Sequence, residues 1–385
     1  MPEYPHPVSS KLPHIGTTIF TVMSQLATEH QALNLSQGFP DFDCAPQLRE
    51  RFCHYINAGL NQYPPMAGVM RLRQAIAEKI HALYGTSYDP EHEITITPGA
   101  TYGIFSCVSA FVSPGDEVIL FEPSYDSYAP AVEIHGGKPV YVSMRYPDYS
   151  IDWEAVSQAI TPKTRMMILN TPNNPTASVL GSEDMRVLEN LLKNTRIIVA
   201  SDEVYEHLVF DGHQHQSIAR YPGLAERSFL VNSFGKTYAI TGWKMGYVAA
   251  PKSLMAEFRK VHQFNAFVAN GPVQYALADY MQDPQAYLGL TSFYQKKRDL
   301  FLNSIQHSRF KPLPSRGTFF QNLDYSNISD EKDTDLAIRL TRDYGIASIP
   351  VSVFYRQAPA HRVLRFCFAK SDEILQKAGA ILSKI

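Results

Sequence analysis

The chain has 385 residues, a length that favours two structural units or one large α/β unit and disfavours mini-proteins and repeat scaffolds. Hydrophobic residues make up 45% and charged residues 19%, which excludes a disordered chain and allows a deep core. Lys and Arg total 35 against 37 Asp and Glu, so a net charge of -2 provides no overall field for nucleic acid, and we expect a small-molecule substrate.

The N-terminal region and the cysteines indicate the compartment. The first residues contain Pro2, Pro5, Pro7 and Pro13 and lack the basic-then-apolar layout of a secretory signal. No stretch reaches the roughly 18 apolar residues of a membrane span. The four cysteines are widely separated and form no C-x-x-C pair, which is typical of reduced thiols. We therefore predict a cytoplasmic protein with no membrane partner, no nucleic-acid partner and no metal site.

The expected elements begin with a helix over residues 17–29 and an extended segment over residues 34–43. Short apolar, β-rich runs then recur, separated by segments long enough for a helix or a crossover. These runs are residues 94–97, 117–121, 166–170, 197–201, 229–233 and 246–250. This rhythm predicts an α/β fold with a mostly parallel central sheet.

Helical patterns continue from residue 251 to about residue 306, and strands are expected at residues 317–323, 346–351 and 363–368. We therefore predict a large domain over residues 46–284. A smaller α+β domain would combine the N-terminal arm, residues 1–45, with residues 285–385.

Polar or conformationally special residues follow several of the predicted strands. In open α/β sheets, ligands bind beyond the carboxyl ends of the strands, so these loops should converge on one site. The loops are residues 98–101, 122–125, 171–176, 202–205 and 234–237.

The most specific motif is Ser233-Phe-Gly-Lys236-Thr-Tyr-Ala-Ile-Thr-Gly-Trp-Lys244, which follows a predicted strand. Gly235-Lys236-Thr237 is not a nucleotide-binding P-loop, because that motif needs a glycine at position 230, where this chain has Leu230. A lysine directly after a strand, with a serine before it and a second cation after it, suits a cofactor that carries an aldehyde and a phosphate.

Three further motifs occur in a matching order: Pro98-Gly-Ala-Thr101, Asn170-Thr-Pro-Asn-Asn-Pro175 and Ser201-Asp-Glu-Val-Tyr205. Together with the Lys236 segment, they resemble the class I/II aminotransferases of fold type I, which use pyridoxal 5'-phosphate (PLP). The resemblance extends from about residue 17 to the C-terminus. It implies the PLP-dependent transferase fold and PLP as the cofactor.

By this resemblance, Lys236 forms the Schiff base with the cofactor aldehyde and later moves the proton at the substrate Cα. Asp202 would pair with the ring nitrogen and keep it protonated. Asn174 and Tyr205 would hydrogen-bond the phenolic oxygen of the ring, and Tyr125 would stack on the ring.

The phosphate would rest on the backbone N–H groups of Ala100 and Thr101 at a helix N-terminus. Ser233 and Lys244 would add a hydroxyl group and a positive charge. Many family members have arginine at the position of Lys244, so this chain would hold the phosphate with a point charge instead of a fork. Tyr63 resembles the tyrosine that reaches the phosphate of the neighbouring subunit, which implies a homodimer.

The substrate side of the site follows from the same resemblance. Arg365 would hold the α-carboxylate with its fork of donors, beside Asn174, and Gly38 would allow close backbone approach to the same group. Phe20 and Phe354 are candidates for the wall around the substrate side chain, which suggests an apolar or sulfur-containing group. No second arginine is evident for a side-chain carboxylate.

Within the family, the chain resembles the branch of methionine aminotransferases and kynurenine aminotransferase/glutamine transaminase K, and most closely the bacterial methionine aminotransferases. This implies transfer of the amino group from L-methionine, or from aromatic amino acids or glutamine, to a 2-oxo acid by a ping-pong mechanism. A kynurenine/glutamine transaminase that also eliminates β-substituents from cysteine conjugates stays open. A non-catalytic sensor is disfavoured, because no N-terminal extension could form a helix-turn-helix domain.

Overall fold

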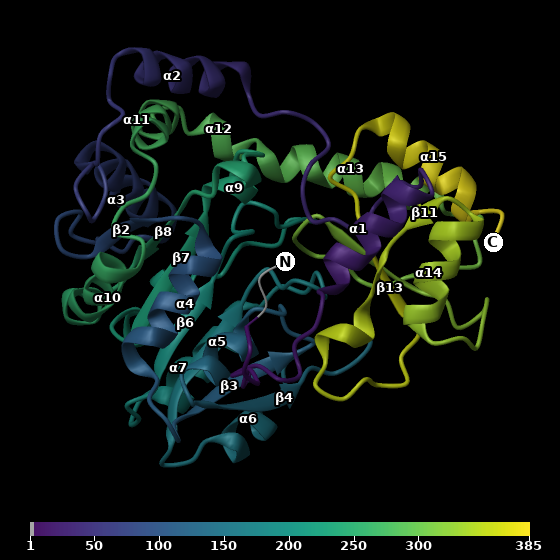
Figure 1. Ribbon diagram of the computed structural model, residues 1–385, viewed down its shortest axis with the longest axis horizontal. Coiled ribbons are helices and arrows are strands. Elements are labelled where there is room, and N and C mark those ends of the chain that lie inside the picture. Colours follow the sequence, from purple (N-terminus) through teal and green to yellow (C-terminus); the bar gives the residue numbers. More distant parts are fainter. Residues whose placement is uncertain (1–3) are drawn as a thin grey trace.

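A seven-stranded sheet lies at the centre of the computed structural model, which describes residues 4–385 (Figure 1). Its strand order is β2-β8-β7-β6-β5-β3-β4. Only β8 runs against its neighbours, β2 and β7, while the remaining neighbours pair in parallel. The strands are β2 (Ile94–Thr97), β3 (Glu117–Glu122), β4 (Lys138–Ser143), β5 (Thr164–Asn170), β6 (Ile198–Asp202), β7 (Ser228–Ser233) and β8 (Gly246–Ala249).

Helices cover both faces of this sheet, which explains why its inner strands are rich in apolar residues. Along β3, Val118 and Leu120 belong to the core that includes residues of α4, α5 and α10, whereas Ile119 and Phe121 belong to the core that includes residues of α3, α7 and α11. These helices are α4 (Ala100–Phe111), α5 (Tyr128–Ile134), α10 (Lys252–Asn265), α3 (Met70–Tyr84), α7 (Ser182–Leu192) and α11 (Gly271–Tyr280).

A segment near the N-terminus and the C-terminal part of the chain form a second group of elements, on the right of Figure 1. A four-stranded sheet has the order β12-β13-β10-β9, and β1 near the N-terminus pairs in parallel with β11. These strands are β1 (Leu33–Asn34), β9 (Lys311–Pro312), β10 (Phe320–Asp324), β11 (Ile346–Ala347), β12 (Ile349–Pro350) and β13 (Val363–Cys367). The helices here are α1 (Ile19–Glu29), α14 (Asp333–Asp343) and α15 (Asp372–Leu382). We keep the division at residues 45/46 and 284/285 as a proposal.

Helix α13 (Leu290–Ser304) runs between the two groups and packs against α15. The remaining helices are α2 (Pro46–Asn57), α6 (Trp153–Ala159), α8 (Pro222–Ala225), α9 (Phe234–Thr237) and α12 (Gln285–Leu288), with 3-10 turns at Ile218–Arg220, Thr241–Trp243 and Val351–Phe354.

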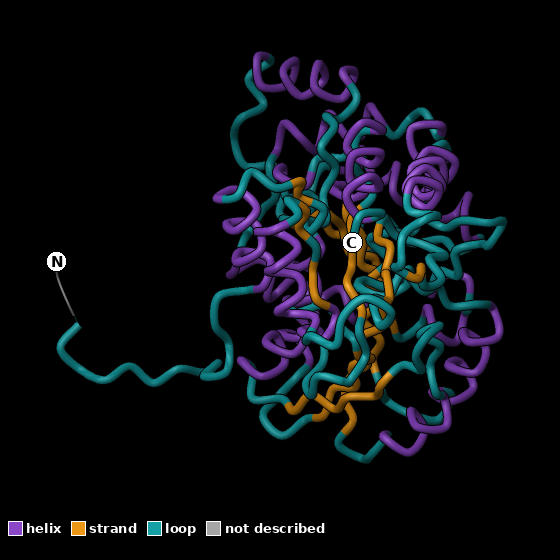
Figure 2. The backbone as a smooth tube through the Cα atoms, turned by 90° about the vertical axis from the view of Figure 1, so that its right-hand side faces the viewer, coloured by secondary structure: helices purple, strands orange, loops and turns teal. Residues whose placement is uncertain are grey.

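Figure 2 shows the start of the described chain extending away from the body as loop. Within residues 4–385, no helix has both the length and the apolar character needed to cross a bilayer.

The α/β fold with a mostly parallel sheet is confirmed, and all six predicted central runs form strands. Strand β4 was not predicted, because it is a partly exposed edge strand whose mixed composition hides the apolar signal. The predicted strand at residues 346–351 was wrong in its extent. The run divides because Ile346 and Ala347 pair with β1, whereas Ile349 and Pro350 pair with β13.

Candidate active site

The loops that follow the central strands meet at one cavity, as the sequence predicts. Each of the five loops contributes at least one residue to its lining. A second cavity adjoins it and shares Tyr125, Asn174, Tyr205, Lys236 and Thr241 with it. The first cavity thus opens into the second, which is also lined by Phe20, Gln37, Gly38, Phe39, Phe320 and Arg365.

Lys236 stands between the two cavities, on the single helical turn α9 that directly follows β7. Its ammonium group donates a hydrogen bond to the Gly38 carbonyl oxygen at 2.7 Å. Burial lowers the pKa of Lys236 to about 8, with nearby Arg365 and Lys244 acting in the same direction. A lysine with this pKa is partly neutral near neutral pH, so its nitrogen can act as a nucleophile and as a base.

Asp202 lies at the carboxyl end of β6 and lines the first cavity. Burial raises its pKa to about 6, although the Tyr128 hydroxyl, which donates to Asp202 Oδ2 at 2.6 Å, acts in the opposite direction. The backbone N–H of Val204 donates to the other carboxylate oxygen at 3.3 Å. Above pH 6 this site therefore presents a buried anion that is suited to a cationic partner in the cavity.

The N-terminus of α4 also borders this cavity, and its first turn presents backbone N–H groups that suit an anion. Gly99 is its N-cap with a positive φ of 84°, and no side chain caps the helix. A Cβ on Gly99 would lie 3.5 Å from the Lys244 Nζ, so this exposed cation stands beside the free N–H groups of the first turn. A Cβ on Gly246 would lie 2.6 Å from the Asn232 carbonyl oxygen and 3.0 Å from the Ala100 nitrogen, so only glycine permits this close approach.

Arg365 is fully buried on β13 and forms one wall of the second cavity. Its guanidinium group donates to Asn174 Oδ1, and to the Ser36 carbonyl oxygen at 3.2 Å. The group also lies 3.9 Å from the centre of the Phe320 ring. Burial lowers the pKa of Arg365 only to about 10, so it stays charged at neutral pH. Its Nε atom is buried without a hydrogen-bond partner, which leaves a donor for a carboxylate.

The aromatic candidates for the substrate wall are arranged in two layers. Phe20 lines the second cavity, and Phe354 lies 6.0 Å from it, measured between ring centres. Phe354 is buried and is not among the residues that line either cavity. Gly38 borders the same cavity, but its lack of a side chain serves packing, because a Cβ there would lie 2.8 Å from the Phe320 ring.

The remaining predicted residues fall into two groups. Ala100, Thr101, Tyr125, Asn174, Tyr205 and Ser233 all line the first cavity. Tyr63 does not line either cavity: its side chain is exposed, and its ring centre lies 5.5 Å from that of Phe267. A role for Tyr63 in the site of a second subunit stays a prediction.

Sequence reasoning missed Tyr128, Phe320 and Gln37. Tyr128 lies three residues after Tyr125, at the start of α5, and this spacing could have suggested a shared site. Phe320 contacts Arg365 only because β10 and β13 pair, so no local signal marks it. Gln37 donates to the Phe20 carbonyl oxygen at 2.9 Å and ties α1 to the loop after β1.

These residues form a donor set that fits one kind of cofactor. A lysine with a lowered pKa suits an aldehyde, the uncapped turn beside Lys244 suits a phosphate, and the buried Asp202 carboxylate suits a protonated ring nitrogen. No cluster of side chains within residues 4–385 has the composition of a metal site.

Comparisons with known proteins agree with this geometry. The family model of the class I and II aminotransferases matches residues 30–381. The chain is 47% identical to the methionine aminotransferase of Escherichia coli over 98% of both chains, and 33% identical to human kynurenine–oxoglutarate transaminase 1 over 94% of both. The crystal structure of YbdL from Escherichia coli, described as a methionine aminotransferase, superposes with a TM-score of 0.97 at 46% identity and covers 99% of this chain and 100% of its own.

The family match and these relatives extend over nearly the whole chain, and the identities are too high for a likeness of fold alone. The catalytic class is therefore that of the family, and this enzyme belongs to the class I and II aminotransferases.

Proposed function

We propose that this aminotransferase uses PLP to move the amino group of L-methionine, and also of aromatic amino acids or glutamine, to a 2-oxo acid. The observation that carries the proposal is the second cavity, which combines the buried Arg365 with Phe20, Phe39 and Phe320. Among the described residues that line the two cavities, Arg365 is the only arginine. The site therefore offers one fork for the α-carboxylate and an apolar wall for the side chain.

In this proposal the first cavity holds PLP. Lys236 takes the aldehyde, Asp202 the ring nitrogen, Tyr125 the ring face, and Asn174 with Tyr205 the phenolic oxygen. The phosphate is held by Ala100, Thr101, Ser233 and Lys244. When bound, PLP supplies an electron-poor ring that accepts the electron pair of the bond broken at the substrate Cα.

The chain's own groups then perform binding and proton transfer. The neutral amine of Lys236 takes the proton from the donor Cα and can return one, a step for which a pKa of about 8 suits both directions near neutral pH. Arg365 orients the donor through its α-carboxylate. Phe20, on α1, covers the donor side chain and reduces the access of water.

The proposed assembly is a homodimer in which Tyr63 reaches the phosphate of the partner site. Its support is the exposure of Tyr63 at 80%, together with that of Phe264 at 86%, which is unusual for large aromatic side chains. We also keep the cytoplasmic location as part of the proposal, since all four cysteines are free.

The rate at which the cofactor-free protein combines with PLP should rise with pH and level off above about pH 8. The physical reason is that only the neutral amine of Lys236 attacks an aldehyde, and burial brings its pKa to about 8. Stopped-flow absorbance between pH 6 and pH 10 measures the rate. Nα-acetyl-lysine is the control, and its rate should keep rising to about pH 10.4. Equal midpoints for protein and control would contradict a lowered pKa.

The donor should be identified by a half-reaction without any 2-oxo acid. The yellow protein is mixed separately with methionine, phenylalanine, glutamine, kynurenine, glutamate and aspartate, and the loss of visible absorbance is followed. We expect methionine to react fastest and aspartate to react at least about 100-fold more slowly, because its side-chain carboxylate would be buried without a cation. A faster reaction with aspartate or glutamate would refute the proposed donor.

A second candidate is a kynurenine or glutamine transaminase with β-elimination activity on cysteine conjugates. The 33% identity to human kynurenine–oxoglutarate transaminase 1 supports this second candidate function. The same half-reaction separates the two, because kynurenine or glutamine would then exceed methionine. Pyruvate release from a cysteine conjugate would report the elimination directly.

A further inference from the structure

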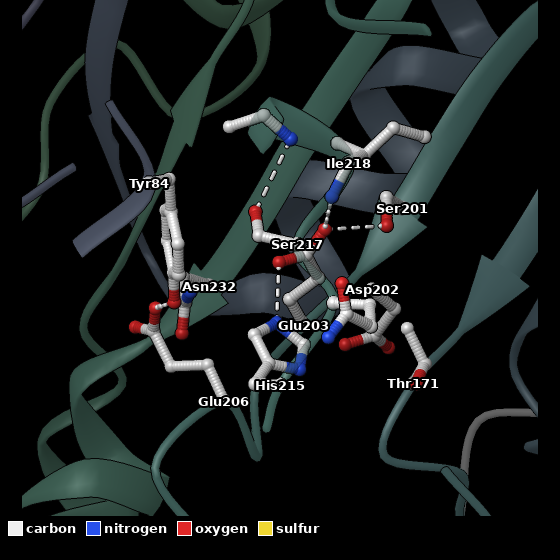
Figure 3. Close-up of polar contacts among 12 residues, drawn as sticks. Tyr84, Thr171, Ser201, Asp202, Glu203, Glu206, His215, Ser217, Ile218 and Asn232 are labelled. Atoms are coloured by element: carbon white, nitrogen blue, oxygen red, sulfur yellow. Dashed lines mark hydrogen bonds and ion pairs between the residues drawn. The ribbon is translucent and has the colours of Figure 1, made fainter. Parts of the chain in front are cut away.

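Glu203 is a fully buried carboxylate that the proposed reaction does not use. It directly follows Asp202 at the end of β6, and consecutive strand residues point to opposite faces of a sheet. Asp202 therefore points into the cofactor cavity while Glu203 points to the far side. There its oxygens accept hydrogen bonds from the Ser201 hydroxyl and the Ile218 N–H, both at 2.8 Å, and from His215 at 2.7 Å (Figure 3).

These three contacts tie separate parts of the chain to the end of β6. Ser201 belongs to the strand itself, His215 to the loop beyond the following turn, and Ile218 to a 3-10 turn. The turn between them carries Tyr205, which lines the cavity. Loss of the Glu203 carboxylate would leave buried donors unpaired on all three segments, so this side chain fixes the backbone that presents both Asp202 and Tyr205.

The charge of Glu203 has little compensation. Of the described residues, His215 is the only basic side chain within ion-pair distance of it. His215 Nε2 faces the carboxylate, and its Nδ1 is buried without a partner, which favours the neutral ring with the proton on Nε2. The nearby Lys79 pairs instead with Glu206, which also accepts from Tyr84.

Other titratable and charged groups near Glu203 on this side of the sheet are three phenols, Glu206 with its partners, Glu93 beside Tyr88, and Arg220, which lies over the Tyr84 ring. Burial, assisted by the charges of Glu203 or Glu206, raises the pKa of Tyr84, Tyr88 and Tyr247 far above their usual value, so they stay neutral. Burial opposes ionisation of Glu206, but Lys79 and His207 hold its pKa well below the usual range. On the cavity side, Asp202 faces Tyr128 and Lys236.

We propose that Glu203, hydrogen-bonded to His215, is a positioning residue for Asp202: it fixes the turn after β6 and keeps a negative charge behind the Asp202 carboxylate. This inference rests on the proposed role of Asp202 toward the ring nitrogen. A second anion one residue away raises the pKa of Asp202, and it favours the protonated forms of the other groups in the cavity, the ring nitrogen included. It thereby helps the site to hold a cationic ring, although Glu203 never contacts the cofactor.

The test is a pH titration of the visible absorbance of the PLP-loaded protein, in the wild type and in Glu203→Gln. The glutamine side chain has nearly the same shape as glutamate and retains an acceptor for Ser201 and Ile218, but it lacks the charge. We expect the titration midpoint to fall by about 0.5 pH unit or more, because loss of a nearby anion destabilises every protonated form in the cavity.

The matched control is Glu206→Gln, which removes a buried carboxylate from the same turn but from the cluster around Lys79. Glu206→Gln leaves Lys79 buried without its anion, so the thermal unfolding temperature of this variant should fall at least as much as that of Glu203→Gln. The titration midpoint of Glu206→Gln should nevertheless stay within about 0.2 pH unit of the wild type. Glu203→Asp retains the charge at the cost of shorter reach. Its midpoint should also stay close to the wild type, whereas a purely structural role predicts no such rescue.

Equal midpoint shifts in Glu203→Gln and Glu206→Gln, or no shift in the former, would overturn the inference. If Glu203→Gln does not fold, as judged by circular dichroism, a shift of about 0.5 unit in folded Glu203→Asp overturns it as well. Before any variant is tested, the wild type is mixed with PLP. Failure to become yellow would reject the proposed cofactor itself, and this inference with it.

Discussion

Replacing Lys236 by alanine should abolish transamination, with a loss of about 10⁴-fold or more in rate, since one nitrogen acts both as nucleophile and as proton carrier. The other groups of the first cavity stay in place, so PLP should still bind through its phosphate cradle, without a covalent link to the protein. Single-turnover kinetics with methionine measure the rate. Mass spectrometry after borohydride reduction detects the covalent link in the wild type and should detect none in the variant.

Lys370 provides a matched control for this experiment. It is also buried, and its ammonium group donates to the carbonyl oxygen of Phe39, the residue after the Gly38 carbonyl that Lys236 contacts. Lys370 does not line either cavity. Lys370→Ala should therefore retain the covalent link and a rate within about tenfold of the wild type. Covalent attachment that persists in Lys236→Ala would refute the assignment.

Replacing Arg365 by lysine should lower kcat/KM for methionine by about 30- to 5,000-fold, which corresponds to 2–5 kcal/mol for a buried charged contact. Lysine retains the charge but not the fork, and it cannot reach Asn174, Ser36 and a carboxylate together. Steady-state kinetics with methionine measure this loss. The amine 3-(methylthio)propylamine has the same side chain without the carboxylate, so its slow half-reaction should change by less than about tenfold.

The control for Arg365→Lys is Arg298→Lys. Arg298 is likewise buried, but its guanidinium group holds Asp211 through two hydrogen bonds at 2.6 and 2.7 Å, outside both cavities. This variant should lose stability and keep its preference for methionine over the amine. An equal loss for both substrates in Arg365→Lys would show that Arg365 does not bind the carboxylate.

Residues on the central strands and their loops were predictable because local sequence determines their positions. A parallel sheet places the carboxyl ends of its strands at one edge, so residues that follow apolar runs meet there without further information. Lys236 after β7 and Asp202 at the end of β6 are of this kind, and both line the same cavity. The antiparallel β8 was not evident, since apolar runs carry no mark of direction.

Residues outside the central sheet depend on pairings between distant segments. Arg365 meets the cavity because β13 pairs with β10 and because the loop after β1 crosses it, so that Ser36 and Phe320 reach the guanidinium group. From the sequence, glycine at position 38 was expected to allow close backbone approach to the substrate carboxylate. In the structure, the ring of Phe320, from a distant part of the chain, is what excludes a side chain there. Phe354 proved to be buried behind Phe20 instead of lining the cavity.

The sequence by itself determined the α/β class, the family resemblance and the residues that gather at the strand ends, because apolar periodicity and short motifs are local properties of the chain. The tertiary structure alone decided which groups set the properties of those residues. Burial brings Lys236 to a pKa of about 8 and Asp202 to about 6, Tyr128 of α5 reaches Asp202 on β6, and Glu203 holds its turn through His215. Burial and contacts of this kind arise only when distant segments pack, and no local pattern in the chain encodes them.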